Sequence, residues 1–317
     1  MMTNIVSVGL PINEALRVQK NRFLPTGVTD PAGLKRISVV TGIHGDELEG
    51  QYVCFELARL LNEHPEHLHG VVDIYPAMNP FGIDSITRGL PAFDLDMNRI
   101  FPGNNDGDMV EYIAAEIVKD ISGSDLCFDI HASNIYLTEI PQIRINTLHE
   151  DWLLPLAELC NVDFIWVHGA STVLESTFAY SLNSTGTPTL VVEMGVGMRL
   201  TRDYCFQLLD GILNAMAHLG VWDGPTKPVR TPIISRDADD VAFLNAERAG
   251  IFIKDVEHGA HVRCGERLGR IVYPPEGRVL WEVTAPVDGW LFTIREYPVV
   301  ESGSLVARIL KNREGGR

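Results

Sequence analysis

Short apolar runs alternate with longer amphipathic stretches over the first two-thirds of this chain, and this alternation limits the possible folds most strongly. Strand-like runs stand at 36–42, 71–76, 126–131 and 189–193, and helical spacing of apolar residues stands at 47–61, 110–121, 152–160 and 204–219. Parallel strands need a crossover connection, which a helix usually supplies. The pattern therefore predicts a layered α/β domain with a largely parallel sheet.

The pattern changes near residue 228, where the long helical periods stop. Short, glycine-punctuated strands are predicted at 251–253, 268–272, 279–284, 290–294 and 305–310. Such spacing is typical of a small all-β module. We expect two domains, at residues 1–228 and 229–317.

Two segments of the second domain, 257–269 and 285–290, resemble the hairpins of biotinyl/lipoyl-type barrel-sandwich domains. Those carriers modify a lysine on an exposed hairpin. No lysine lies between Lys254 and Lys311, so the sequence excludes a swinging-arm carrier. A packing, pocket-shaping or oligomerising role is expected instead.

Charge and composition exclude several classes of partner. The 317 residues carry 26 Lys+Arg against 42 Asp+Glu, a formal net charge of −16, which argues against binding a phosphate backbone. No apolar run reaches the ~18–20 residues that a membrane span requires. Five cysteines, an odd number without a CxxC pair, favour reduced thiols and a cytoplasmic location. The sequence leaves homo-oligomerisation open.

Polar residues stand where two predicted strands end. His44 and Glu47 follow the first strand three residues apart, and His131 ends a later one. In open α/β sheets ligands bind at the carboxyl ends of strands. Two histidines and one carboxylate form the protein ligand set of a catalytic zinc, with a fourth position for water. Zinc lowers the pKa of such a water towards ~7 and polarises a carbonyl group.

Further polar residues have two interpretations each. Glu193, at the end of another strand, could be a general base facing the zinc-bound water, or a helix-capping or ion-paired carboxylate. Arg88 and Arg99 could bind a carboxylate or stabilise an oxyanion, or be surface ion-pair partners. Asp129, two residues before His131, could hold a histidine tautomer or be a buried strand-end carboxylate.

Five short segments resemble, in their order along the chain, the motifs of the zinc-carboxypeptidase-like succinylglutamate desuccinylase/aspartoacylase family. They are GIHGDELEG (42–50), Asn79-Pro80, DLDMNRIFPG (94–103), DIHAS (129–133) and VEMG (192–195). The resemblance covers roughly residues 36–200. It implies a three-layer α/β domain with a mixed, largely parallel sheet, followed by a small all-β domain packed near the site.

The resemblance also implies roles for single residues. One zinc ion per chain would be held by His44, Glu47 and His131, with Glu193 as general base. The scissile carbonyl would be polarised by Arg88, and the substrate carboxylate would be bound by Asn98 and Arg99.

The sequence departs from the family pattern at two points. Between Arg88 and Asn98 the chain is longer than in aspartoacylase, with Gly89-Leu90-Pro91-Ala92 inserted. Aspartoacylases carry an arginine between a tyrosine and the general base, and the interval 180–188 has none. Arg144 could replace it. Tyr180 could donate a hydrogen bond to substrate, or be a half-buried aromatic residue. The two departures weigh against specificity for an acidic side chain.

The sequence thus predicts a zinc-dependent amidohydrolase that cleaves a small N-acylated amino acid or a related carboxylate-bearing small molecule. Two alternatives remain: a metallocarboxypeptidase acting on peptide C-termini, and a non-catalytic binding protein on the same fold.

Overall fold

A computed structural model of the chain describes residues 1–91, 93–169 and 175–312. Four adjacent parallel strands form its centre, in the order β4 (Val71–Tyr75), β3 (Arg36–Thr41), β5 (Leu126–Ala132) and β8 (Thr189–Gly195). They are nearly continuous runs of buried residues, as expected for a sheet covered on both faces. The predicted mixed α/β fold with a largely parallel central sheet is confirmed.

Further strands extend the sheet on both sides. On one side β2 (Ala15–Phe23) pairs antiparallel with β4, and β1 (Met2–Gly9) pairs antiparallel with β2. On the other side β6 (Leu137–Asn146) is antiparallel to β8, and β7 (Phe164–His168) is parallel to β6. Strand β9 (Ile233–Ser235), which lies in the predicted second domain, pairs with β7.

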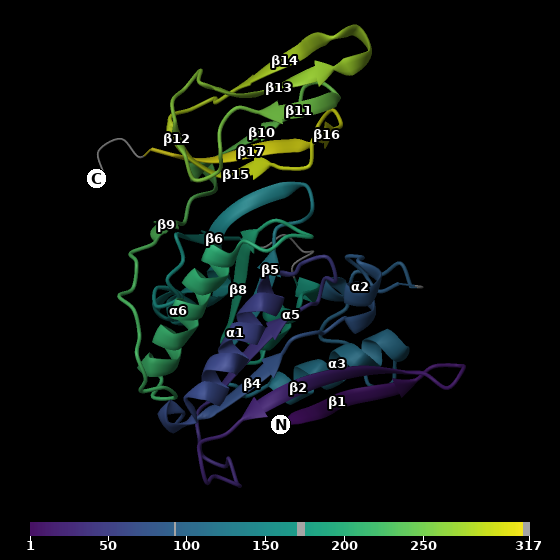
Figure 1. Cartoon of the computed structure of the whole chain (residues 1–317), viewed down its shortest axis with the longest axis vertical. Coiled ribbons are helices and arrows are strands. Elements are labelled where there is room, and N and C mark those ends of the chain that lie inside the picture. Colours follow the sequence, from purple (N-terminus) through teal and green to yellow (C-terminus); the bar gives the residue numbers. More distant parts are fainter. Residues whose placement is uncertain (92, 170–174, 313–317) are drawn as a thin grey trace.

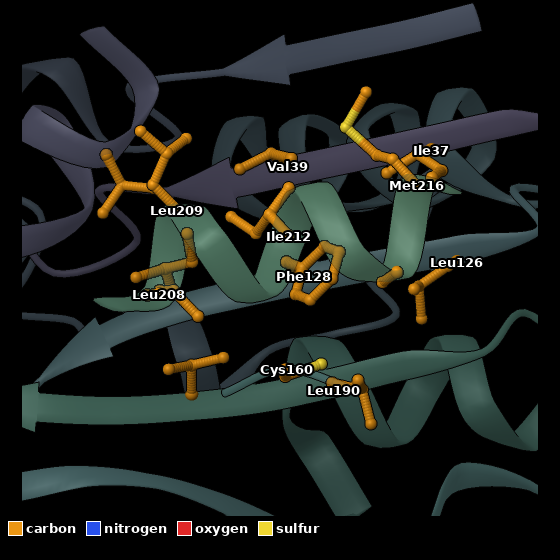
Figure 2. Close-up of a cluster of buried hydrophobic side chains, with 14 of the residues drawn as sticks. Ile37, Val39, Leu126, Phe128, Cys160, Leu190, Leu208, Leu209, Ile212 and Met216 are labelled. Atoms are coloured by element: carbon orange, nitrogen blue, oxygen red, sulfur yellow. The ribbon is translucent and has the colours of Figure 1, made fainter. Parts of the chain in front are cut away.

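Helices cover both faces of the sheet (Figure 1). On one face lie α1 (Glu49–Glu63), α4 (Glu150–Ala157) and α6 (Arg202–His218), and on the other lie α3 (Met109–Ile121) and α5 (Phe178–Ser184). Successive residues of a strand point to opposite faces of the sheet. Val39 therefore packs in the core on the side of α1, α4 and α6, and Val40 in the core on the side of α3 and α5. Figure 2 shows Val39 and Phe128 of the sheet facing Ile212 of α6. Short helix α2 (Pro80–Ser85) follows β4.

The C-terminal part is an antiparallel β domain, as expected. Its strands are β10 (Val241–Asn245), β11 (Gly250–Lys254), β12 (His261–Val262), β13 (Arg267–Tyr273), β14 (Arg278–Thr284), β15 (Gly289–Arg295), β16 (Val299–Val300) and β17 (Leu305–Lys311). Four of them form a separate sheet in the order β14-β13-β11-β16. The barrel-sandwich likeness of this domain stays a prediction.

One sheet runs through both parts of the molecule. Strand β15 pairs antiparallel with β6, so β15, β17, β10 and β12 belong to the same 13-stranded sheet as the parallel centre. A small core cluster crosses this junction, in which Ile140 and Phe164 join Val241, Phe292 and Leu310. The β domain therefore packs directly beside the end of β6, above the carboxyl ends of the central strands (Figure 1). Within the described ranges, no helix combines the length and apolar character that crossing a membrane requires.

Candidate metal centre and its cavity

His44, Glu47 and His131 come together although two separate strands supply them. His44 and Glu47 lie on the turn between β3 and α1, and His131 lies near the end of the adjacent parallel strand β5. All three are buried, and one ligand atom from each lies within 4.8 Å of the others. His44 Nδ1 is 2.8 Å from Glu47 Oε1, and His131 Nδ1 is 2.9 Å from Glu47 Oε2.

The turn that carries this cluster is fixed by backbone packing. Gly42 has a φ of +73°, in the left-handed region that glycine adopts without strain. A Cβ on Gly45 would meet the backbone carbon of Gly82 at 2.0 Å, so a glycine is required for this close approach. The motif therefore places His44 and Glu47 by backbone contact with α2.

Each histidine presents its other ring nitrogen to a carboxylate. His44 Nε2 lies 3.0 Å from Asp96 Oδ1, and His131 Nε2 lies 3.1 Å from Asp129 Oδ1. For His44, the hydrogen bond of Nε2 to Asp96 favours the tautomer that leaves a lone pair on Nδ1, the atom that faces Glu47. For His131, it is Nδ1 that is hydrogen-bonded, to Glu47 Oε2, and in the part of the chain that the structure describes Nε2 makes no well-aligned hydrogen bond. Within the described residues, the buried Nδ1 of His44 makes no well-aligned hydrogen bond. The donor set of two imidazoles and one carboxylate thus fits a divalent metal ion, which His44, Glu47 and His131 would hold.

Glu47 is ionised despite its burial. Burial acts to raise the pKa of this carboxyl group, but when His44 and His131 are protonated their positive charges and hydrogen bonds outweigh burial and hold the pKa below its usual range. The Ala132 amide also donates to Glu47 Oε2 at 3.2 Å. A negatively charged oxygen ligand is therefore present at neutral pH, as metal binding requires.

Glu193 lies beside this cluster at the end of β8, where it stands opposite His131 in the parallel register. Burial raises the pKa of its carboxyl group, and the nearby positive charge of Arg144 opposes the shift. The net direction is upward, which suits a carboxylate that must take up a proton.

The predicted arginines and asparagine reach the same cavity from the segment 88–99. Arg88 donates to Glu47 Oε1 at 2.7 Å, and its Nε lies 3.6 Å from Asp96 Oδ2. Asn98, in a 3-10 helix at Met97–Arg99, is buried, and its Oδ1 accepts from the Phe178 amide at 2.8 Å. Arg99 is exposed and donates to the Asn98 carbonyl at 2.7 Å.

Arg144 and Tyr180 also line the cavity, with different surroundings. Arg144 is engaged by carboxylates: its Nη2 is 3.0 Å from Glu139 Oε2, and its Nη1 is 3.2 Å from Glu193 Oε1. Tyr180 is partly exposed, and its ring centroid lies 6.0 Å from that of His149.

One cavity of about 530 Å³ thus joins every residue predicted for the site. Its wall also contains residues that the sequence analysis did not select: Glu139, Asn146, His149 and Arg308. Asp96, which contacts His44, lies within the DLDMNR motif, so this motif could have identified Asp96 as a residue of the site. No local signal marked Arg308, which comes from the second part of the chain.

The fold and the residues of the cavity together show which class of protein this chain belongs to. It is a mixed α/β protein with a candidate metal centre and a neighbouring carboxylate at the carboxyl ends of its parallel strands, where open α/β sheets bind ligands.

The chain belongs to the succinylglutamate desuccinylase/aspartoacylase family, because residues 33–219 match the family model described as the succinylglutamate desuccinylase/aspartoacylase catalytic domain. An N-alpha-acetyl-L-2,4-diaminobutyric acid deacetylase from Halomonas elongata is 27% identical over 278 residues, which cover 84% of this chain and 80% of that protein.

Solved structures share the fold over almost the whole chain. A succinylglutamate desuccinylase/aspartoacylase from Rhodobacter sphaeroides superposes with a TM-score of 0.80 at 25% identity, covering 98% of this chain and 96% of that one. The product-bound ectoine utilization protein EutE (DoeB) from Ruegeria pomeroyi gives 0.78 at 22% identity, covering 94% and 90%. The similarity therefore includes the C-terminal β domain.

Proposed function

We propose that this protein is a zinc-dependent amidohydrolase that removes the acyl group from a small N-acylated amino acid or a related carboxylate-bearing molecule. The observation that carries the proposal is the meeting, in one cavity, of His44, Glu47 and His131 with Glu193. Family membership and the deacetylase from Halomonas elongata support amide hydrolysis of a small substrate.

Each part of the cavity has a task in this reaction. When bound by His44, Glu47 and His131, zinc supplies Lewis-acid polarisation of a carbonyl oxygen and activates water at neutral pH. Glu193 accepts the proton of the attacking water, and the raised pKa of its carboxyl group favours that transfer. The same carboxyl group then donates the proton to the departing amine.

The cationic and amide side chains of the cavity bind the substrate carboxylate and stabilise the negative charge that develops on the scissile carbonyl oxygen. Arg88 lies against Glu47 at the cavity wall, where its guanidinium can donate to the oxygen of the scissile carbonyl as negative charge develops. Asn98 and Arg99 line the cavity, and in this proposal their amide and guanidinium groups bind the free carboxylate of the substrate. Arg144 is shared between Glu139 and Glu193, which supports a role beside the base more than direct binding of an acidic side chain.

The first experiment separates metal binding from turnover. Protein purified without added metal is assayed by plasma mass spectrometry, and a panel of N-acetyl and N-succinyl amino acids is tested beside C-terminal peptides. We expect about one zinc per chain, and Glu193→Gln should retain that zinc while turnover falls by about 100- to 10,000-fold. His131→Ala, the matched control, should lose both.

Three results would contradict parts of the proposal. Full activity in Glu193→Gln would refute its role as base. Hydrolysis confined to peptides would favour a metallocarboxypeptidase. Bound metal without hydrolysis of any amide would favour a binding protein on this fold.

A further inference from the structure

A row of alternating charges, partly buried and centred on the buried Glu139, joins the C-terminal β domain to Glu193. Arg308 of β17 donates to Oε1 of Glu139 on β6. Arg144 donates to Oε2 of the same carboxylate at 3.0 Å, and its Nη1 lies 3.2 Å from Glu193 Oε1. Glu139 is only 1% exposed, so bulk water does little to screen these contacts.

The order of the strands builds this row. Thr293 of β15 stands opposite Glu139 on one side and opposite Arg308 on the other, so the three residues align across adjacent strands. Thr293 Oγ1 also donates to Glu139 Oε1 at 3.1 Å. A register irregularity between Glu139 and Gln142 changes the alternation of β6. It lets Glu139 and Arg144 reach the same cavity, although residues five positions apart on a regular strand point to opposite faces.

The charges in the row depend on one another. Glu139 and Glu193 both approach Arg144, and Arg308 supplies Glu139 with a second guanidinium. A buried carboxylate without enough cationic or donor partners is costly. Without Arg308, Glu139 would therefore draw Arg144 towards itself and away from Glu193.

We propose that Arg308 is a positioning residue for the reaction: by pairing with Glu139 it leaves Arg144 able to hold the Glu193 carboxylate at the cavity edge. The inference rests on the proposed role of Glu193 as general base. It gives the C-terminal β domain a part in catalysis without contact between Arg308 and the reacting atoms.

The test compares Arg308→Met, which keeps length and loses charge, with wild type and with two further variants. We expect kcat to fall by about 10- to 100-fold, the usual effect of removing a supporting partner, while KM is unchanged. Arg308→Lys should recover part of kcat because it restores the charge. Arg270→Met, the matched control, removes the charge of an arginine of the same β domain that faces Asp255 rather than Glu139, and it should keep kcat close to that of wild type.

Crystal structures of wild type and Arg308→Met provide a readout that does not depend on activity. We expect the Arg144 Nη1–Glu193 Oε1 separation to exceed the ~4 Å limit of an ion pair in the variant, while His44, Glu47 and His131 stay in place. An unmoved Arg144–Glu193 pair would overturn the inference, as would a rise in KM at constant kcat, which would place Arg308 in direct contact with substrate.

Failure of the proposed function can be distinguished from failure of the inference about Arg308. If wild type hydrolyses no compound of the panel, the assignment of Glu193 as base fails, yet the two crystal structures still decide whether Arg308 controls the Arg144–Glu193 pair. If Arg308→Met does not fold, the same comparison is made with Arg308→Lys, whose ammonium lacks the planar fork of a guanidinium. That variant should show a lengthened Arg144–Glu193 pair and a smaller loss of kcat, and an unchanged pair would again overturn the inference.

Discussion

The histidines of the candidate metal centre contact carboxylates on the side of the ring away from Glu47, and Asp129 is one of these carboxylates. Asp129 is almost fully buried and lies 3.1 Å from Nε2 of His131, on the side of the ring opposite Glu47. Within the described residues neither Asp129 Oδ1 nor His131 Nε2 makes a well-aligned hydrogen bond, so the contact is electrostatic. We expect a carboxylate in this position to orient the imidazole and to increase its basicity. The two interpretations of Asp129 are thus compatible: it is a buried strand carboxylate that contacts a candidate metal ligand.

Replacement of Asp129 by asparagine keeps the shape and removes the charge. We expect Asp129→Asn to bind zinc about 10- to 100-fold more weakly, as measured by competition with a chelating dye. Asp73→Asn is the matched control, because Asp73 is an equally buried strand carboxylate that pairs with Arg22 away from the cavity. Equal zinc affinity in wild type and Asp129→Asn would show that the tautomer is fixed by other groups.

At the scale of elements, helix α6 and the loop before β12 contact each other through one hydrogen bond. Tyr204 Oη of α6 lies 2.6 Å from His258 Nε2 in that loop. Burial lowers the pKa of His258, and the positive charge of Lys254 lowers it further. The folded protein therefore holds His258 neutral where the unfolded chain, with a histidine pKa near ~6.5, already takes up a proton.

The direction of the pH effect follows from this difference. Because the unfolded state binds more protons, the contribution of His258 to stability is complete above pH ~6.5 and is lost as the pH falls towards the folded pKa. We therefore expect the unfolding midpoint in urea of wild type, relative to that of His258→Gln, to become lower from pH 7 to pH 5. His261→Gln, on an exposed neighbouring position, should keep the wild-type slope. Identical slopes for wild type and His258→Gln would disprove the effect.

The elements that the sequence predicted share a strong local pattern. Strands β3, β5 and β8 are short runs in which apolar residues predominate and polar residues stand mostly at the ends, and α1, α3 and α6 carry regular apolar faces. Strand β6 was missed because Glu139, Gln142 and Arg144 interrupt its apolar pattern although all of it is buried or nearly so. The β1–β2 hairpin was missed because most of β1 is exposed at the edge of the sheet.

At the scale of the whole molecule, the sheet that runs from β6 into β15 couples the two parts of the chain. Ile140 and Phe164 share a core cluster with Val241, Phe292 and Leu310, so unfolding either part alone would expose the partner surface of the other. The domain boundary predicted at residue 228 stays a prediction. The shared core cluster makes it unfavourable for either part to unfold by itself.

Calorimetry tests this coupling. We expect one thermal transition whose calorimetric and van't Hoff enthalpies agree, as for a single cooperative unit. Phe292→Ala, which opens the shared cluster, should lower the midpoint or split the transition, and Phe252→Ala, buried in the core of the β domain alone, serves as the control for loss of a phenyl ring. Two transitions in the wild-type protein would show that the junction does not couple the parts.

The sequence by itself determined the parallel centre of the fold and the short motifs that carry His44, Glu47, His131 and Glu193, because strand periodicity and residues at strand ends are local properties of the chain. Tertiary structure alone decided the partners of those residues. Arg308 reaches Glu139, and Arg144 reaches Glu193, only because β17, β15, β6 and β8 lie side by side in one sheet. Strand order is set by packing between distant segments, and no local pattern records it.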